Sequence, residues 1–98
     1  MRLGQVIGTV VATQKDEGLV GSKLLVVQEM LPDGTLTDTY AVAIDTVGAG
    51  KGEVVLCVSG SSARLTQRTR NTPVDTAIIA IIDSVEVHGR VTFQKAKQ

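Results

Sequence analysis

Residues 41–64 read AVAIDTVGAGKGEVVLCVSGSSAR, and this stretch decides the fold. An apolar run ends at Asp45, a glycine-rich loop follows, and a second, β-branched run occupies residues 53–59. Val, Ile and Thr are stiff at the first side-chain torsion and favour pleated strands over helices. The segment 61–67 is the one helical candidate, with Ser59 or Ser61 as its N-cap. The stretch therefore predicts a strand, a loop, a second strand and one short α-helix.

The same alternation of apolar runs and turn residues continues in both directions along the chain. Strands are predicted at residues 2–13, 23–30, 36–45, 53–59, 76–87 and 90–94, and a turn at His88-Gly89 joins the last two into a C-terminal hairpin. Five main strands without a βαβ rhythm predict an all-β fold, a small OB-like five-stranded Greek-key barrel. Residues 1–98 are predicted to form one domain. A β-sandwich is the alternative.

Two of the predicted strands have distinctive faces. The first is apolar on both faces, so the core covers one face and another surface must cover the second. Gly4 and Gly8 within it suit a strand that coils sharply to close a barrel. In the third strand the small residues Thr39, Ala41 and Ala43 share one face. The two apolar faces of the first strand favour contacts outside a single barrel.

Composition limits how so short a chain can be stabilised. A domain of 98 residues buries only about two-thirds of its unfolded surface, so one chain alone is expected to be marginally stable. Disulfides are excluded because Cys57 is the only cysteine, and a structural zinc site lacks ligands because His88 is the only histidine. No cofactor is expected. Burial between subunits is therefore the favoured source of stability.

The sequence predicts no catalytic site. The loop at 48–52 looks like a phosphate-binding loop, but Asp45 occupies the place of its first glycine, and Gly52 replaces the Ser or Thr that would hold magnesium. A dinucleotide-binding fingerprint fails as well, because a strand follows the loop instead of a helix. No acid obviously orients His88 as a general base beside Ser61 or Ser62. We therefore expect a protein that is not an enzyme.

Nucleic-acid binding is the alternative function that an OB barrel raises. Single-strand binders combine a basic groove with several aromatic platforms on which bases stack. This chain has one Tyr and one Phe, and its ten basic and ten acidic residues cancel. We therefore expect no nucleic-acid partner. The sequence also shows no signal peptide and no apolar run long enough to span a membrane, so we expect a cytoplasmic protein without a membrane partner.

Three ordered motifs resemble the EutN/CcmL family, the vertex proteins of bacterial microcompartments. They are AIDTVGAGKGE at 43–53, VSGSSAR at 58–64 and PVDTAIIAIID at 73–83, and residues 8–15 and 23–27 fit as well. The resemblance covers almost the whole chain. It implies an OB-like barrel, a flat homopentamer and no enzymatic chemistry. It also implies a structural place among hexameric shell proteins, closing the corners of a microcompartment shell in the bacterial cytoplasm.

Within the family, the sequence resembles the EutN-like members of catabolic compartments more than the carboxysome members. Carboxysome members tend to carry Arg before the Gly-Ser segment and Trp after the glutamate of the glycine-rich segment. Here Ser59 and Val54 take those places, and Ser62 precedes Ala63. The resemblance therefore implies a catabolic compartment, such as one that handles ethanolamine or another aldehyde-forming substrate.

Nine residues are predicted to lie at a subunit boundary or around the axial opening of the ring. They are Asp45, Gly48, Ala49, Gly50, Gly60, Ser61, Ser62, Arg64 and Asp75. We expect Arg64 near a boundary and paired with Asp45 or Asp75. Gly48 to Gly50 could line the opening, but we favour the polar start of the short helix, Ser61 and Ser62. There the unpaired N–H groups would attract anions.

Overall fold

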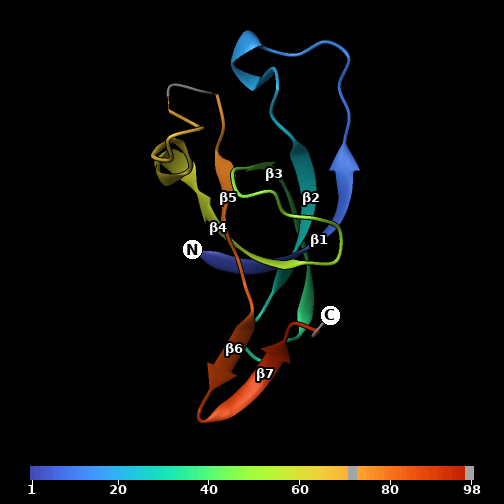
Figure 1. Ribbon diagram of the computed structural model, residues 1–98, viewed down its shortest axis with the longest axis vertical. Helices are drawn as coiled ribbons and strands as arrows, with labels where there is room; N and C mark the ends of the chain where they lie inside the picture. Colours follow the sequence, from blue (N-terminus) through green and yellow to red (C-terminus); the bar gives the residue numbers. More distant parts are fainter. Residues whose placement is uncertain (71–72, 97–98) are drawn as a thin grey trace.

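Strands make up most of the molecule, a computed structural model that describes residues 1–70 and 73–96. The two helical segments in the described residues are short 3-10 turns, labelled η1 and η2. The elements are β1 (Arg2–Val10), η1 (Glu17–Leu19), β2 (Leu24–Met30), β3 (Leu36–Asp45), β4 (Val54–Ser59), η2 (Gly60–Arg64), β5 (Thr76–Ile81), β6 (Ser84–Val87) and β7 (Arg90–Gln94). Figure 1 shows η1 and the β6–β7 hairpin at opposite ends of the long axis.

The first five strands close a barrel in the order β1-β2-β3-β5-β4, and β6 and β7 form a separate two-stranded sheet. All barrel neighbours are antiparallel except β3 and β5, which run parallel and pair at Ile44–Ala77 and Asp45–Ile78. The predicted all-β fold, the five-stranded barrel and the C-terminal hairpin are confirmed. Among the described residues, no helix is long and apolar enough to cross a membrane.

Three predicted elements differ from the structure. The strand expected at 76–87 is interrupted after Ile81, where the Ile82 amide donates to the Val54 carbonyl at 2.8 Å and the chain leaves the barrel for the hairpin. The first strand ends at Val10 rather than at residue 13. The helix expected at 61–67 is the 3-10 turn η2 rather than an α-helix, and the side chain of its N-cap, Ser59, makes no capping hydrogen bond.

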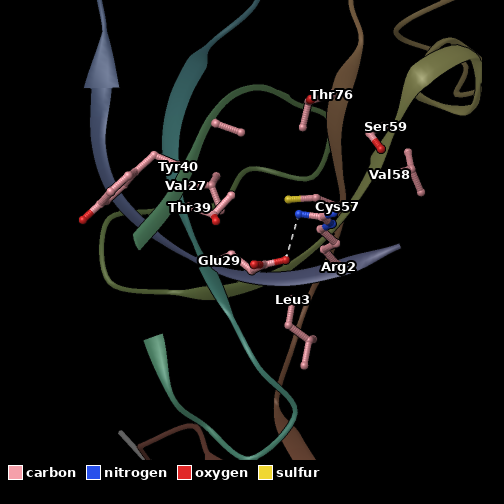
Figure 2. A pocket seen from close by; sticks show the side chains of 11 residues that line it. Arg2, Leu3, Val27, Glu29, Thr39, Tyr40, Cys57, Val58, Ser59 and Thr76 are labelled. Carbon is pink, nitrogen blue, oxygen red and sulfur yellow. Dashed lines mark ion pairs between the residues drawn. The ribbon is translucent and has the colours of Figure 1, made fainter. Parts of the chain in front are cut away.

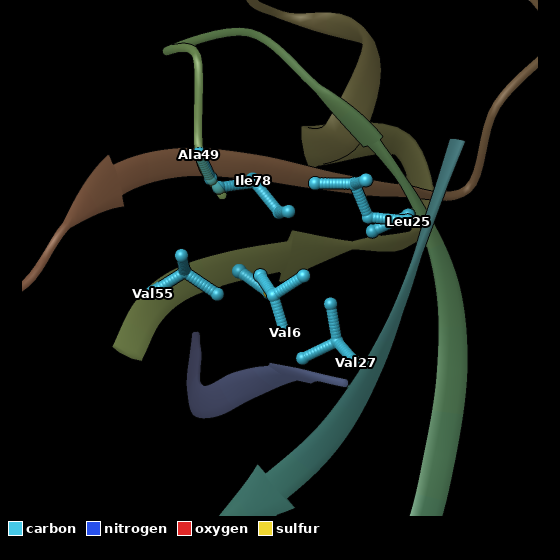
Figure 3. Close-up of a cluster of buried hydrophobic side chains, with 8 residues drawn as sticks. Val6, Leu25, Val27, Ala49, Val55 and Ile78 are labelled. Atoms are coloured by element: carbon cyan, nitrogen blue, oxygen red, sulfur yellow. The ribbon is translucent and has the colours of Figure 1, made fainter. Parts of the chain in front are cut away.

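The barrel is filled by a cluster of aliphatic side chains and one thiol (Figure 3). Each of the five barrel strands contributes at least one member, and the loop after β3 contributes Ala49. The cluster consists of Val6, Leu25, Val27, Ala43, Ala49, Val55, Cys57 and Ile78. Mainly β-branched and small residues fit here because opposite walls of a five-stranded barrel lie close together. A smaller cluster of Ile44, Ala63 and Ala77 holds η2 against the barrel.

The two glycines of β1 have different roles. A Cβ on Gly4 would collide with the Val27 side chain and lie 3.1 Å from the Gln28 carbonyl oxygen, so β1 approaches β2 too closely to admit a side chain unless Val27 or the strands shift. Gly8 has open space around it and lies where the β1–β2 register shifts by one residue. The bulge at this shift lets β1 pair with β4 at its start and with β2 along its length.

Candidate functional site

Asp45, at the end of β3, holds the glycine-rich loop in place. Its Oδ1 accepts hydrogen bonds from the backbone amides of Val47 at 3.0 Å and Gly48 at 3.2 Å, and its Oδ2 accepts one from Ala49 at 3.0 Å. Asp45 is only 5% exposed. The three bonds fold the loop back over the barrel end and seat Ala49 in the core. The Asp45 carboxylate therefore serves its own subunit.

The loop residues 48–50, which sequence analysis placed at an interface or opening, separate in the structure. Gly48 is exposed and has a φ of +79°, in the left-handed region that favours glycine. Ala49 is 1% exposed and belongs to the core. The Gly50 amide donates to Glu53 Oε1 at 2.7 Å, which closes the loop from the other side. Of these three residues, only Ala49 is therefore already buried within a single subunit.

The second predicted group, around η2, lies on the surface. The Gly60 amide donates to the Asp75 carbonyl at 2.7 Å, which joins the start of η2 to the start of β5. Ser61, Ser62 and Arg64 are exposed, and among the described residues Arg64 makes no ion pair. Because Asp45 is buried and Asp75 is exposed, Asp75 is the better candidate partner for Arg64 across a boundary. That contact stays a prediction.

A groove that sequence analysis did not predict lies at the seam between β3 and the β4–β5 pair (Figure 2). Its volume is about 240 Å³. An ion pair of 3.0 Å between Arg2 and Glu29 crosses it. We call it the seam groove, lined by Arg2, Leu3, Val27, Glu29, Thr39, Tyr40, Ala41, Cys57, Val58, Ser59 and Thr76. The only sequence signal for it is the small-residue face of β3.

The seam groove is poorly suited to catalysis. Cys57 borders it but is only 8% exposed, and burial raises the pKa of its thiol to about 11. A thiol of this kind stays protonated near neutral pH and is a poor nucleophile. Among the described residues, no group of three or more His, Cys, Asp or Glu side chains could hold a metal ion.

The raised pKa of Cys57 predicts a loss of stability at alkaline pH. An unfolded cysteine loses its proton near pH 8.5, whereas the folded thiol keeps it up to about 11. Between these values the folded state binds more protons, so the free energy of unfolding falls as pH rises. Denaturation of the parent and of Cys57→Ala at fixed protomer concentration, from pH 8 to 11, measures this. Equal slopes in both proteins would contradict the assignment.

The amino-acid sequence is similar to those of known proteins over most of its length. The family model described as "Ethanolamine utilisation protein EutN/carboxysome" matches residues 1–83. The bacterial microcompartment shell vertex protein EutN of Escherichia coli K12 is 46% identical over 95 residues, which cover 97% of this chain and 100% of EutN. The carboxysome shell vertex protein CcmL of Synechococcus elongatus is 47% identical over 95 residues, 97% of this chain and 96% of CcmL.

One similar protein of known structure is described as pentameric. The GrpN pentameric microcompartment shell protein from Rhodospirillum rubrum superposes with a TM-score of 0.82 at 47% identity, and the match covers 89% of this chain and 99% of GrpN. The match leaves about a tenth of this chain and almost none of GrpN outside it. The similarity is therefore one of whole domains.

Proposed function

This chain belongs to the EutN/CcmL family, and on that premise we propose that five copies of it close into a ring that caps a vertex of a bacterial microcompartment shell. The observation that carries the proposal is the similarity, across almost the whole chain, to proteins named as shell vertex proteins, one of them described as pentameric. The protein is a structural shell component and not an enzyme.

Its surface supports assembly. Large apolar side chains are exposed on one chain alone, among them Ile7 and Val10 on β1 and Tyr40 and Val42 on β3. Burying apolar area stabilises an interface by about 25 cal/mol per Å². A small barrel with marginal stability thus gains from association. A head-to-tail contact repeated by rotation closes a ring, and five copies give a five-fold corner.

We further propose that hexameric shell proteins surround the ring. A sheet of hexagonal units is flat, and it closes into a polyhedron only where five-fold units replace six-fold ones. A pentamer of this chain would supply such a unit. Mixing the purified ring with a hexameric shell protein and examining the product by electron microscopy tests this proposal. Closed particles only when the ring is present support it, and closed particles without it count against it.

The compartment type stays a prediction. Identity to E. coli EutN is 46% and identity to Synechococcus CcmL is 47%, so overall similarity does not separate the catabolic type from the carboxysome type. Ser59 and Val54 favour the catabolic type, as the sequence motifs indicated. The nucleic-acid alternative is not supported, because the relatives are shell proteins and Tyr40 is the only strongly exposed aromatic side chain in the described residues.

We propose that Ser61 and Ser62 line the axial opening of the ring, but not that they attract anions there. Both serines are exposed, and neither hydroxyl bonds to another described residue, so they are available at the surface. The anion argument needed a regular helix with an aligned dipole. A five-residue 3-10 turn does not provide one.

The ring itself is directly testable. Native mass spectrometry at micromolar concentration is expected to show a species of five times the 10.3 kDa mass of one chain. The same preparation should not shift a labelled single-stranded oligonucleotide at low salt, a condition that favours binding to any basic surface. A monomer in native mass spectrometry would contradict the proposed ring. Submicromolar binding of the oligonucleotide would instead support the nucleic-acid hypothesis.

A further inference from the structure

The seam between β3 and β5 is the least complete closure of the barrel. The two strands pair only at Ile44–Ala77 and Asp45–Ile78, whereas β3 pairs with β2 over most of its length. Within residues 1–70 and 73–96, no strand pairs with the other edge of β3 at positions 37–42. An unpaired strand edge presents backbone N–H and C=O groups that another chain can bind.

The seam groove lies beside this free edge and is poorly suited to a small ligand. Its volume of about 240 Å³ is below the 300–1,000 Å³ that is typical of small-molecule sites. Its charged groups, Arg2 and Glu29, already pair with each other, and its other polar side chains are the uncharged hydroxyls of Thr39, Tyr40, Ser59 and Thr76. Figure 2 shows that pair across the middle, with Tyr40 on one side and Ser59 on the other. The remaining floor is apolar, formed by Leu3, Val27, Ala41 and Cys57.

We propose that a second copy of this chain covers the seam groove, which is then one half of the contact repeated around the ring. The inference rests on the proposed ring. A five-fold ring needs a heterologous contact, in which one patch of a copy meets a different patch of the next. The groove supplies a concave apolar patch. Protruding apolar side chains lie outside it: Val11, Val20 and Leu65 are 87%, 66% and 79% exposed.

The groove is continuous with the residues that the sequence placed at a boundary. Two of its lining residues, Ser59 and Thr76, are sequence neighbours of Gly60 and Asp75, which the 2.7 Å backbone hydrogen bond joins. A neighbour seated in the groove would therefore lie next to the start of η2, the turn that carries the exposed Arg64. A contact at this one surface would cover the free edge of β3 and bring a neighbour close to the turn that carries Arg64.

Ala41→Lys tests the groove because Ala41 lines it and is exposed in a single chain. The lysine has room in the open groove, so the chain should fold, but its charge and bulk exclude a neighbour. We expect the protomer concentration for half-assembly to rise about tenfold or more, as for a residue at the centre of an interface. Thr35→Lys, the same change at an exposed turn residue outside the groove, is the matched control and should assemble like the parent.

A thiol introduced on the wall of the groove gives a second readout, because Cys57 itself is buried and reacts slowly. Ser59 lines the groove, is exposed and makes no capping hydrogen bond, so Ser59→Cys places an accessible thiol there. A maleimide probe should modify this thiol about tenfold more slowly in the assembled ring of Ser59→Cys than in dissociated protomers of the folded double variant with Ala41→Lys. Circular dichroism melting confirms that the compared proteins are folded. If Ala41→Lys does not fold, Thr39→Lys at the exposed rim of the groove replaces it.

The outcomes distinguish a failure of the groove proposal from a failure of the proposed ring. A parent ring with dissociated Ala41→Lys and faster labelling of the introduced thiol in the protomers supports the proposal. A parent ring that Ala41→Lys leaves intact, or equal labelling of that thiol in ring and protomer, overturns it and shows that the groove stays open in the ring. A monomeric parent removes the proposed function itself, and with it this inference.

Discussion

Asp45→Ala is expected to lower the free energy of unfolding by about 3–5 kcal/mol. Hydrogen bonds to a charged acceptor each contribute about 1.5–3 kcal/mol, and part of this is recovered when exposed amides bind water instead. The Asp45 carboxylate accepts three such bonds, from Val47, Gly48 and Ala49. The Ala49 amide is buried, so its loss of a partner is costly. The loop then no longer seats Ala49 in the barrel.

Two controls make this prediction specific. Asp45→Asn keeps one acceptor oxygen and places an NH₂ group near one side of the loop, so we expect a smaller loss of about 1–3 kcal/mol. Asp38→Ala removes an exposed carboxylate from the same strand, which forms no hydrogen bond with the described residues, and should change stability by less than about 0.5 kcal/mol. Denaturation at one fixed protomer concentration is required, because assembly adds to apparent stability.

Amide hydrogen exchange gives the local readout. In Asp45→Ala the amides of Ala49 and Gly50 should exchange faster than those of the β1–β2 pair, because the loop opens before the barrel does. If Asp45→Ala unfolds within about 1 kcal/mol of the parent, the hydrogen bonds do not hold the loop and the assignment fails.

The role of Asp45 marks the limit of what the sequence could predict. The strand at 36–45, the turn at His88-Gly89 and the five-stranded barrel follow from local patterns, because β-branched runs and turn residues act over a few positions. The sequence also drew attention to Asp45, but as a partner for Arg64. Its actual partners are amides two to four residues ahead, and that choice depends on how the loop packs Ala49 against the barrel.

Other features escaped the sequence because they depend on distant contacts. The bend after Ile81 arises where the Ile82 amide meets β4, and the turn-forming pair Asp83-Ser84 that follows was too short a signal to divide the strand predicted at 76–87. The seam groove exists because β5 meets β3 at only two pairs. The exposed positions of Ser61, Ser62 and Arg64 agree with a surface role, but which neighbour they face is decided by the angle between subunits. A single chain does not contain that angle.

Gly4→Ala carries the second large expected effect, a loss of about 1–3 kcal/mol of unfolding free energy, as for other overpacked cores. The new methyl group would collide with the Val27 side chain and press on the Gln28 carbonyl. Val27 cannot turn away freely because it belongs to the core cluster. β1 and β2 must therefore separate where β1 also pairs with β4.

Gly8→Ala is the matched control, in the same strand and with no atom within 4 Å of the added Cβ. It should change stability by less than about 0.5 kcal/mol, or stabilise slightly by restricting the unfolded chain. A cycle with Val27→Ala identifies the cause: the double variant with Gly4→Ala should lose less than the sum of the two single losses, because the methyl group fills part of the space that Val27→Ala vacates. Strictly additive losses would place the strain in the backbone contact with Gln28, and a Gly4→Ala protein as stable as the parent would show that β1 and β2 are not pressed together there.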